Sequence, residues 1–137
     1  MEYSRMASID KEIIWAVGFY DGKGHCGIHK IGNKPRAKRI CVTLAQVELQ
    51  PLERFRNAVG GKVNGPYNHY TNKNGKPYFQ WTSWGTYKTT VEVFEKLRPY
   101  LSEPKTEQFL KALKEYEEYQ LTEKFTKSAR ILGPDGP

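Results

Sequence analysis

The clearest hydrophobic pattern in the chain is the alternation of side-chain types between Ala37 and Gln46. Successive side chains of an extended strand point to opposite faces, so alternate residues share a face. One face carries Ile40, Val42 and Leu44, and the other carries Arg39, Cys41 and Thr43. The segment is therefore predicted to be a strand with one buried face and one polar, basic face.

Four other segments carry apolar residues at the three- and four-residue spacing of a helix. The first follows Asp10, whose carboxylate can cap its amino end. The second, "ELQPLERFRNAVGG", ends at Gly60 and Gly61, and Pro99 stops the third. The predicted helices cover residues 11–20, 48–59, 86–97 and 103–120.

Three more segments have the composition of strands, and turn sequences separate them. With the alternating segment, the predicted strands cover residues 24–31, 37–46, 62–71 and 77–84, and "GNKPR" and "NKNGK" are turns. The order is αββαββα. We predict an α+β fold with a four-stranded antiparallel sheet, helices on its apolar face and a bare basic face. One domain is expected over residues 1–120, followed by a loosely ordered tail over 121–137.

Basic residues are segregated along the chain, which has a net charge of +7. The stretch from Gly22 to Val47 holds six Lys and Arg and no acid, and the stretch from Asn57 to Val91 holds four Lys and no acid. Solubilising charge is usually mixed in sign, so this segregation indicates a polyanionic partner. The exposed face of the predicted sheet suits the major groove of duplex DNA.

The side chains expected on the DNA-binding face fall into two groups. Those near the predicted turns are placed to contact phosphates: Lys34, Arg36, Lys73 and Lys76. Those within the strands are placed to contact base edges: His25, His29, Arg39, Thr43, Asn64, Asn68, Gln80 and Thr82. The aromatic residues Phe79, Trp81 and Trp84 are expected in the core.

The stretch "AVGFYDGKG", Ala16 to Gly24, resembles the LAGLIDADG motif of homing endonucleases. The later stretches "LAQVELQPLERFRNAVGGKVNGPY" and "LRPYLSEPKTEQF" are similar to further segments of that family. The chain has one copy of the motif, so it resembles the homodimeric branch. The resemblance implies double-stranded DNA as partner and a dimer interface on the motif helix, formed by Trp15, Gly18, Phe19 and Gly22.

The resemblance also implies a metal-dependent cleavage site. In the family, an acid at the eighth motif position and the backbone carbonyl before it hold Mg²⁺, and here these positions are Lys23 and Gly22. Gln46 and Lys105 match the residues that assist near the scissile phosphate. A protonated lysine cannot ligate Mg²⁺. Asp21 is a weak substitute because it should point elsewhere, so we expect cleavage to be lost or impaired.

Two other interpretations start from the same residues. One is a natural DNA-binding regulator or a maturase-like intron-RNA cofactor on this fold. The other is an interaction module whose charge is incidental. A zinc site is not favoured, because its candidates lack the paired spacing of such sites: His25, Cys26, His29, Cys41 and His69. The N-terminal residues lack a hydrophobic signal region, so an intracellular protein with reduced cysteines is expected.

Overall fold

A computed structural model describes residues 2–31, 38–68, 76–83 and 86–132 of the chain. The predicted order αββαββα is confirmed, with one additional 3₁₀ turn. The elements are α1 (Glu2–Lys23), β1 (His25–Lys30), β2 (Lys38–Gln46), α2 (Leu49–Val59), β3 (Lys62–Tyr67), β4 (Tyr78–Thr82), α3 (Tyr87–Leu97), η1 (Arg98–Tyr100) and α4 (Glu103–Leu132).

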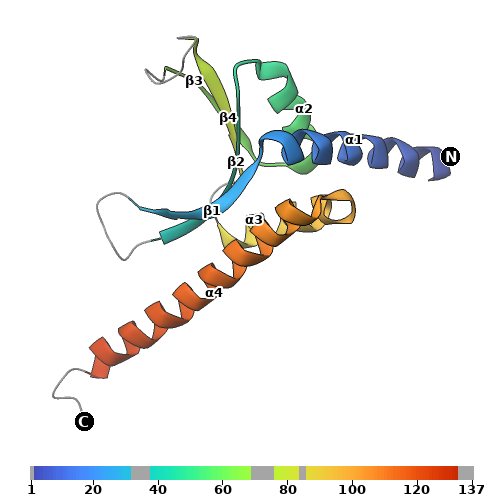
Figure 1. Cartoon of the computed structure of the whole chain (residues 1–137). Coiled ribbons are helices and arrows are strands. Elements are labelled where there is room, and N and C mark those ends of the chain that lie inside the picture. The colour runs from blue at the N-terminus through green and yellow to red at the C-terminus, as the bar shows by residue number, and fades with distance from the viewer. Residues whose placement is uncertain (1, 32–37, 69–75, 84–85, 133–137) are drawn as a thin grey trace.

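The four strands form one antiparallel sheet in the order β1-β2-β4-β3. Figure 1 shows the helices gathered on one side of the curved sheet, so that its other face is left open. The predicted α+β architecture, with helices on one face of a four-stranded sheet, is therefore confirmed. β2 lies at the centre of the sheet and pairs with both β1 and β4.

The core lies between the sheet and the helices. Ile40, Val42 and Leu44 are all buried there, as the alternation predicts. Trp81 is completely buried; its ring meets that of Phe55 edge-to-face at 4.7 Å between ring centroids, and its Nε1 donates to the Gly60 carbonyl at 2.7 Å. Edge-to-face contact is a preferred arrangement for aromatic pairs, and the hydrogen bond satisfies the buried indole.

The ends of two helices differ from the sequence prediction. α1 begins at Glu2, so Asp10 lies inside the helix and is not its cap. α4 continues to Leu132 instead of ending at Gln120. Neither added segment contains Gly or Pro before the helix boundary, and without such residues the backbone hydrogen bonds can continue. The helical part of the predicted tail is therefore residues 121–132.

The end of α2 is as predicted, and the start of α3 has a cap that was not predicted. Gly60 and Gly61 end α2 with φ angles of 88° and 90°, a conformation that favours glycine. Thr86 caps α3, because its side chain accepts a hydrogen bond from the Thr89 backbone nitrogen at 3.2 Å. The predicted turn at residues 32–36 and all but Lys76 of the predicted turn at 72–76 lie outside the described residues.

Candidate nucleic-acid interface

The open face of the sheet is hollowed into a groove of about 570 Å³, which we call the sheet groove. Its lining comes from all four strands: His29, Lys30, Arg39, Cys41, Thr43, Lys62, Asn64, Gln80 and Thr82. Three of these residues are Lys or Arg, and none is acidic. A concave surface lined by one sign of charge concentrates the electrostatic potential and attracts a polyanion.

Strand register brings these residues together from distant parts of the sequence. His25 pairs with Thr43, which pairs with Thr82, which pairs with Lys62. Directly paired residues point to the same face of a sheet, so the row lies on the groove face. Thr43, Thr82 and Lys62 line the sheet groove, whereas His25 lines a separate hollow between β1 and α4. A second pair, His29 and Arg39, lies further along β1 and β2.

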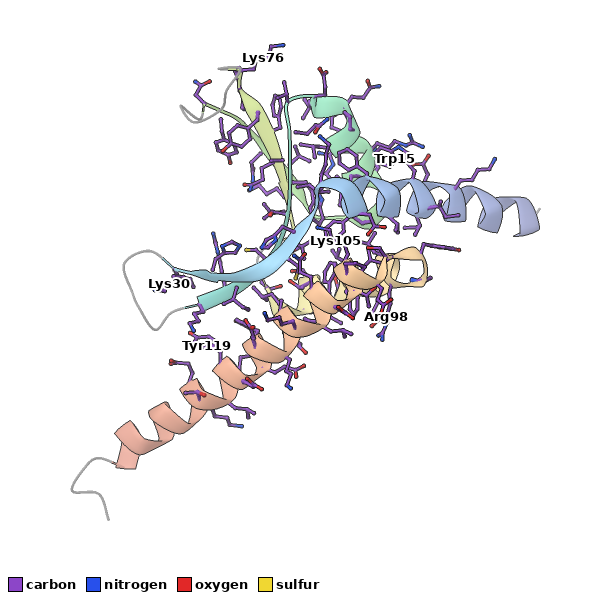
Figure 2. The ribbon with its side chains drawn as sticks, in the orientation of Figure 1. Trp15, Lys30, Lys76, Arg98, Lys105 and Tyr119 are labelled. Atoms are coloured by element: carbon purple, nitrogen blue, oxygen red, sulfur yellow. The ribbon has the colours of Figure 1, made fainter. Side chains whose placement is uncertain are left out.

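Six of the predicted base-reading residues line the sheet groove: His29, Arg39, Thr43, Asn64, Gln80 and Thr82. His25 lies on the same face at the start of β1, and Asn68 is exposed just beyond β3. Lys76 is exposed before β4, at the far end of the β3–β4 hairpin in Figure 2. Lys34, Arg36 and Lys73 lie outside the described residues.

Two lysines of the groove, Lys30 and Lys62, are not among the predicted site residues. Lys62 could have been found from the sequence, because it is two residues from Asn64 in the same strand and therefore shares its face. Lys30 ends β1, where its side chain reaches the groove although alternation assigns it to the other face. Figure 2 shows Lys30 at the end of β1 remote from α1.

The residues of the predicted catalytic group meet where α1 passes into β1. Lys23, in the last turn of α1, donates from Nζ to Oε1 of Gln46 at 2.6 Å. Lys105, near the start of α4, donates from Nζ to the Gly24 carbonyl at 2.5 Å and lies over the Tyr20 ring, 5.8 Å from its centroid. Figure 2 shows Lys105 at this junction.

The side chain of Asp21 points toward the start of α4 and not toward Lys23. Its Oδ1 accepts hydrogen bonds from the Ser102 hydroxyl at 2.6 Å and from the Ser102 backbone nitrogen at 3.3 Å. The Ser102 hydroxyl in turn accepts from the backbone nitrogen of Lys105 at 3.4 Å, within the first turn of α4. Asp21 thus ties the end of α1 to the start of α4 and helps to position Lys105. No pattern in the sequence indicates this role for Ser102.

The residues at this junction do not fit Mg²⁺. Lys23, which the resemblance matches to the metal-binding acid, is hydrogen-bonded to Gln46, and the carboxylate of Asp21 is hydrogen-bonded to Ser102. Among the residues that the structure describes, no group of three or more His, Cys, Asp and Glu could hold a metal ion. Mg²⁺ requires hard oxygen ligands, whereas an ammonium group is a cation with no lone pair to donate.

The two cysteines lie on opposite faces of the sheet. Cys26 is buried in the core, while Cys41 lines the sheet groove, and both are free thiols. Burial raises the pKa of Cys26 to about 12 and also raises the pKa of Cys41. Both thiols are therefore protonated near neutral pH. Because they lie on opposite faces of the sheet, they cannot bind one metal ion together. His69, the remaining zinc candidate, lies outside the described residues.

The predicted dimer residues divide into two kinds. Gly18 and Gly22 are exposed on α1, and a Cβ placed on either would meet no atom within 4 Å. Trp15 and Phe19 are half-buried and stack at 5.2 Å between ring centroids, and the Arg54 guanidinium lies over the Trp15 ring at 4.1 Å. The glycine face is therefore open, whereas Trp15 and Phe19 already make contacts within the chain.

Comparison with protein-family models finds no match, and comparison with curated proteins finds none either. Solved structures give clear matches. The homing endonuclease I-CvuI, in complex with its target in the presence of Ca, has a TM-score of 0.59 at 21% identity, over 85% of this chain and 72% of that chain. The LAGLIDADG homing endonuclease I-LtrWI bound to target DNA has a TM-score of 0.61 at 16% identity, over 84% of this chain and 39% of that chain.

A third match is the LAGLIDADG homing endonuclease I-GzeII in complex with its DNA target, with a TM-score of 0.57 at 19% identity, over 77% of this chain and 36% of that chain. The chain spans less than half the length of I-LtrWI and I-GzeII. I-CvuI has also been crystallised with DNA in the presence of Mg. The fold is therefore that of the LAGLIDADG homing endonucleases. No helix among the described residues is long and apolar enough to cross a bilayer.

Proposed function

We propose that this chain binds duplex DNA sequence-specifically as a homodimer, through the sheet groove, and that Lys23 abolishes or impairs metal-dependent cleavage. The observation that carries the proposal is the groove itself. It combines cations with neutral hydrogen-bonding side chains, and it lies on the open face of a fold found in DNA-bound endonucleases. Because DNA is the partner, we expect the protein to act inside the cell.

The composition of the groove supports a division between affinity and specificity. Cations contact phosphates and supply salt-dependent affinity, whereas hydrogen-bonding side chains read the base edges of the major groove. The groove holds both kinds, since Lys30 and Lys62 lie at its margins and Thr43, Asn64 and Gln80 lie along its strands. Lys76, at the tip of β3–β4, extends the phosphate contacts beyond the groove.

A homodimer is supported by the open face of α1. Gly18 and Gly22 are four residues apart, so they lie on one side of the helix, and a Cβ on either would meet no side chain or other element within 4 Å among the described residues. Small residues allow two helix backbones to approach closely. Two copies joined there would present two sheet grooves to one palindromic site, as two-fold symmetric DNA-binding proteins do.

The Lys23–Gln46 pair supports binding without cleavage. A carboxylate with bound Mg²⁺ carries a net charge of about +1, which is also the charge of one lysine ammonium. Lys23 thus keeps the positive charge at the centre of the site while removing the metal ligand. Gln46 accepts through Oε1, so its amide nitrogen stays available to donate to a phosphate oxygen.

The test begins with selection of bound duplexes from a random pool, with Mg²⁺ chelated. We expect a palindrome-like site, bound equally well when Mg²⁺ is present and left uncut. Lys23→Glu restores the missing acid in both subunits, so it should cut near the centre of the selected site when Mg²⁺ is added. Lys88→Glu, the same change on α3 in the helical layer, is the matched control and should stay inactive.

Efficient Mg²⁺-dependent cutting by the unmodified chain would contradict the role given to Lys23. Tight binding by Lys23→Glu with no cutting would mean that a further catalytic element has been lost. That result would favour the natural DNA-binding regulator, for which the Lys23–Gln46 hydrogen bond is the specific supporting observation. A structured intron RNA that displaced the selected duplex would instead favour the maturase-like role.

A further inference from the structure

Strand β3 contains a bulge that changes the face on which Tyr67 lies. Asn64 pairs with Gln80, and Tyr67 pairs with Tyr78. The chain thus advances three residues along β3 but only two along β4, which is the extra residue of a β-bulge. Because side chains alternate, a regular strand would place Tyr67 on the face opposite to Asn64. The bulge returns Tyr67 to the face of Asn64 and Gln80, which both line the sheet groove.

Gly65 fixes the position of this bulge. Its φ is 128°, a backbone conformation that favours glycine. A Cβ at this position would lie 2.9 Å from Cδ1 of Phe79 and 3.0 Å from the carbonyl oxygen of Tyr78. β3 lies at the edge of the sheet, where a bulge also hinders pairing with the strand of another chain. Edge protection requires no aromatic side chain on the groove face, so it does not account for Tyr67.

Tyr67 and Tyr78 form an aromatic pair on the groove face, beyond the residues that line the sheet groove. Their ring centroids are 5.6 Å apart with an angle of 44° between the planes, a favourable arrangement for two aromatic rings. Tyr67 is 41% exposed, so the pair is accessible from solvent. Tyr78 is two residues from Gln80, or roughly 7 Å along a strand. The tip of the same hairpin carries Lys76 (Figure 2), which is placed to contact the DNA backbone beside the pair.

We infer that the Tyr67–Tyr78 pair contacts the C5-methyl group of a thymine in each half-site and thereby selects thymine at that position. The inference rests on the proposed function, because it assumes that duplex DNA occupies the sheet groove. Thymine is the base that presents an apolar group on its major-groove edge, whereas the other three bases present hydrogen-bonding groups there. The sheet groove offers hydrogen-bonding side chains, and the tyrosine pair adds an aromatic surface beside them. Such a surface favours the methyl group over a polar base edge.

The first measurement removes the methyl group alone. Duplexes are selected with the unmodified full chain, and thymine at each pair of symmetric positions is then replaced in turn by deoxyuridine. This replacement keeps the base pair and its hydrogen-bonding groups. Burial of one methyl-sized group is worth roughly fourfold in affinity, so loss of the methyl group from both half-sites should weaken binding by roughly 15-fold at the positions that the tyrosines contact.

The second measurement assigns this methyl effect to Tyr67. Tyr67→Phe keeps the aromatic ring, so it should retain the full effect. Tyr67→Ala removes the ring, so it should bind the thymine duplex and the deoxyuridine duplex with nearly equal affinity. Tyr100→Ala is the matched control, because it makes the same change at an exposed tyrosine of η1, and it should retain the full effect. Thermal melting shows whether each variant is folded.

Three results would overturn the inference while leaving the proposed function intact. A selected site in which no thymine methyl group contributes to binding would contradict it without any variant. A methyl effect that persists in Tyr67→Ala would show that another residue contacts the thymine. Equal weakening by Tyr67→Phe and Tyr67→Ala would show that the hydroxyl group, and not the ring, contacts the DNA. No binding of any duplex by the unmodified chain would instead refute the proposed function, and the thymine contact with it.

Discussion

Replacing Arg39 by glutamine tests the sheet groove most directly. Arg39 is exposed on β2, pairs with His29 across the sheet and lines the groove. Glutamine is polar and of similar length, so the substitution removes a positive charge with little change to the fold. The control is Lys88→Gln, which removes the same charge from an exposed position on α3, in the helical layer. Lys111 is a poorer control, because it lines a hollow that His25 also lines.

The expected size of the effect follows from counterion release. Each phosphate neutralised by a cation contributes about 0.9 to the slope of log affinity against log salt, and a homodimer carries two copies of Arg39, so the slope should become shallower by about 1.8. Over a fourfold rise in salt, from about 50 to 200 mM, the unmodified protein should therefore lose about 12-fold more affinity than Arg39→Gln. Lys88→Gln should keep the full slope.

The assay is a fluorescence-anisotropy titration of a selected duplex at several salt concentrations, with Mg²⁺ chelated. Thermal melting of each variant shows whether the fold is retained. An unchanged slope for Arg39→Gln, together with a shallower slope for Lys88→Gln, would refute the reasoning, because DNA would then lie on the helical side. A shallower slope in both variants would mean that the net charge of the protein, and not the position of each cation, determines the salt dependence of binding.

Three further changes test the fold and the dimer. Tyr20→Phe removes a buried hydroxyl that has no hydrogen-bond partner among the described residues, so the free energy of unfolding should rise by about 1 kcal/mol in a denaturant titration; a fall would show that the hydroxyl is satisfied. Gly61→Ala should lower the free energy of unfolding by about 2–4 kcal/mol, because the backbone at position 61 has a positive φ and the new Cβ would lie 2.6 Å from the Thr82 carbonyl oxygen. Gly18→Leu faces open space in a single chain, so it should leave a folded monomer in light scattering; a stable dimer would place the interface elsewhere.

The sequence was sufficient for features that depend on neighbouring residues. Alternation between Ala37 and Gln46 separates a core face from a groove face because side chains of a strand alternate by geometry alone. The Gly60–Gly61 pair predicts the end of α2, because only glycine adopts such φ angles readily. The acid-free basic stretches and the lysine in the LAGLIDADG-like turn are also visible without a structure.

The long-range contacts of the site were decided only by the tertiary structure. Lys23 meets Gln46 across 23 positions, and Gln108 meets His25 across 83 positions, and no local pattern specifies either contact. The pairing of β2 with β4, which places Lys62 in the same row as His25, depends on how both strands cover one core. Periodicity encodes which face of an element is apolar, because it reflects local backbone geometry. Which side chains then meet depends on how those apolar faces pack together, and that packing exists only in the folded chain.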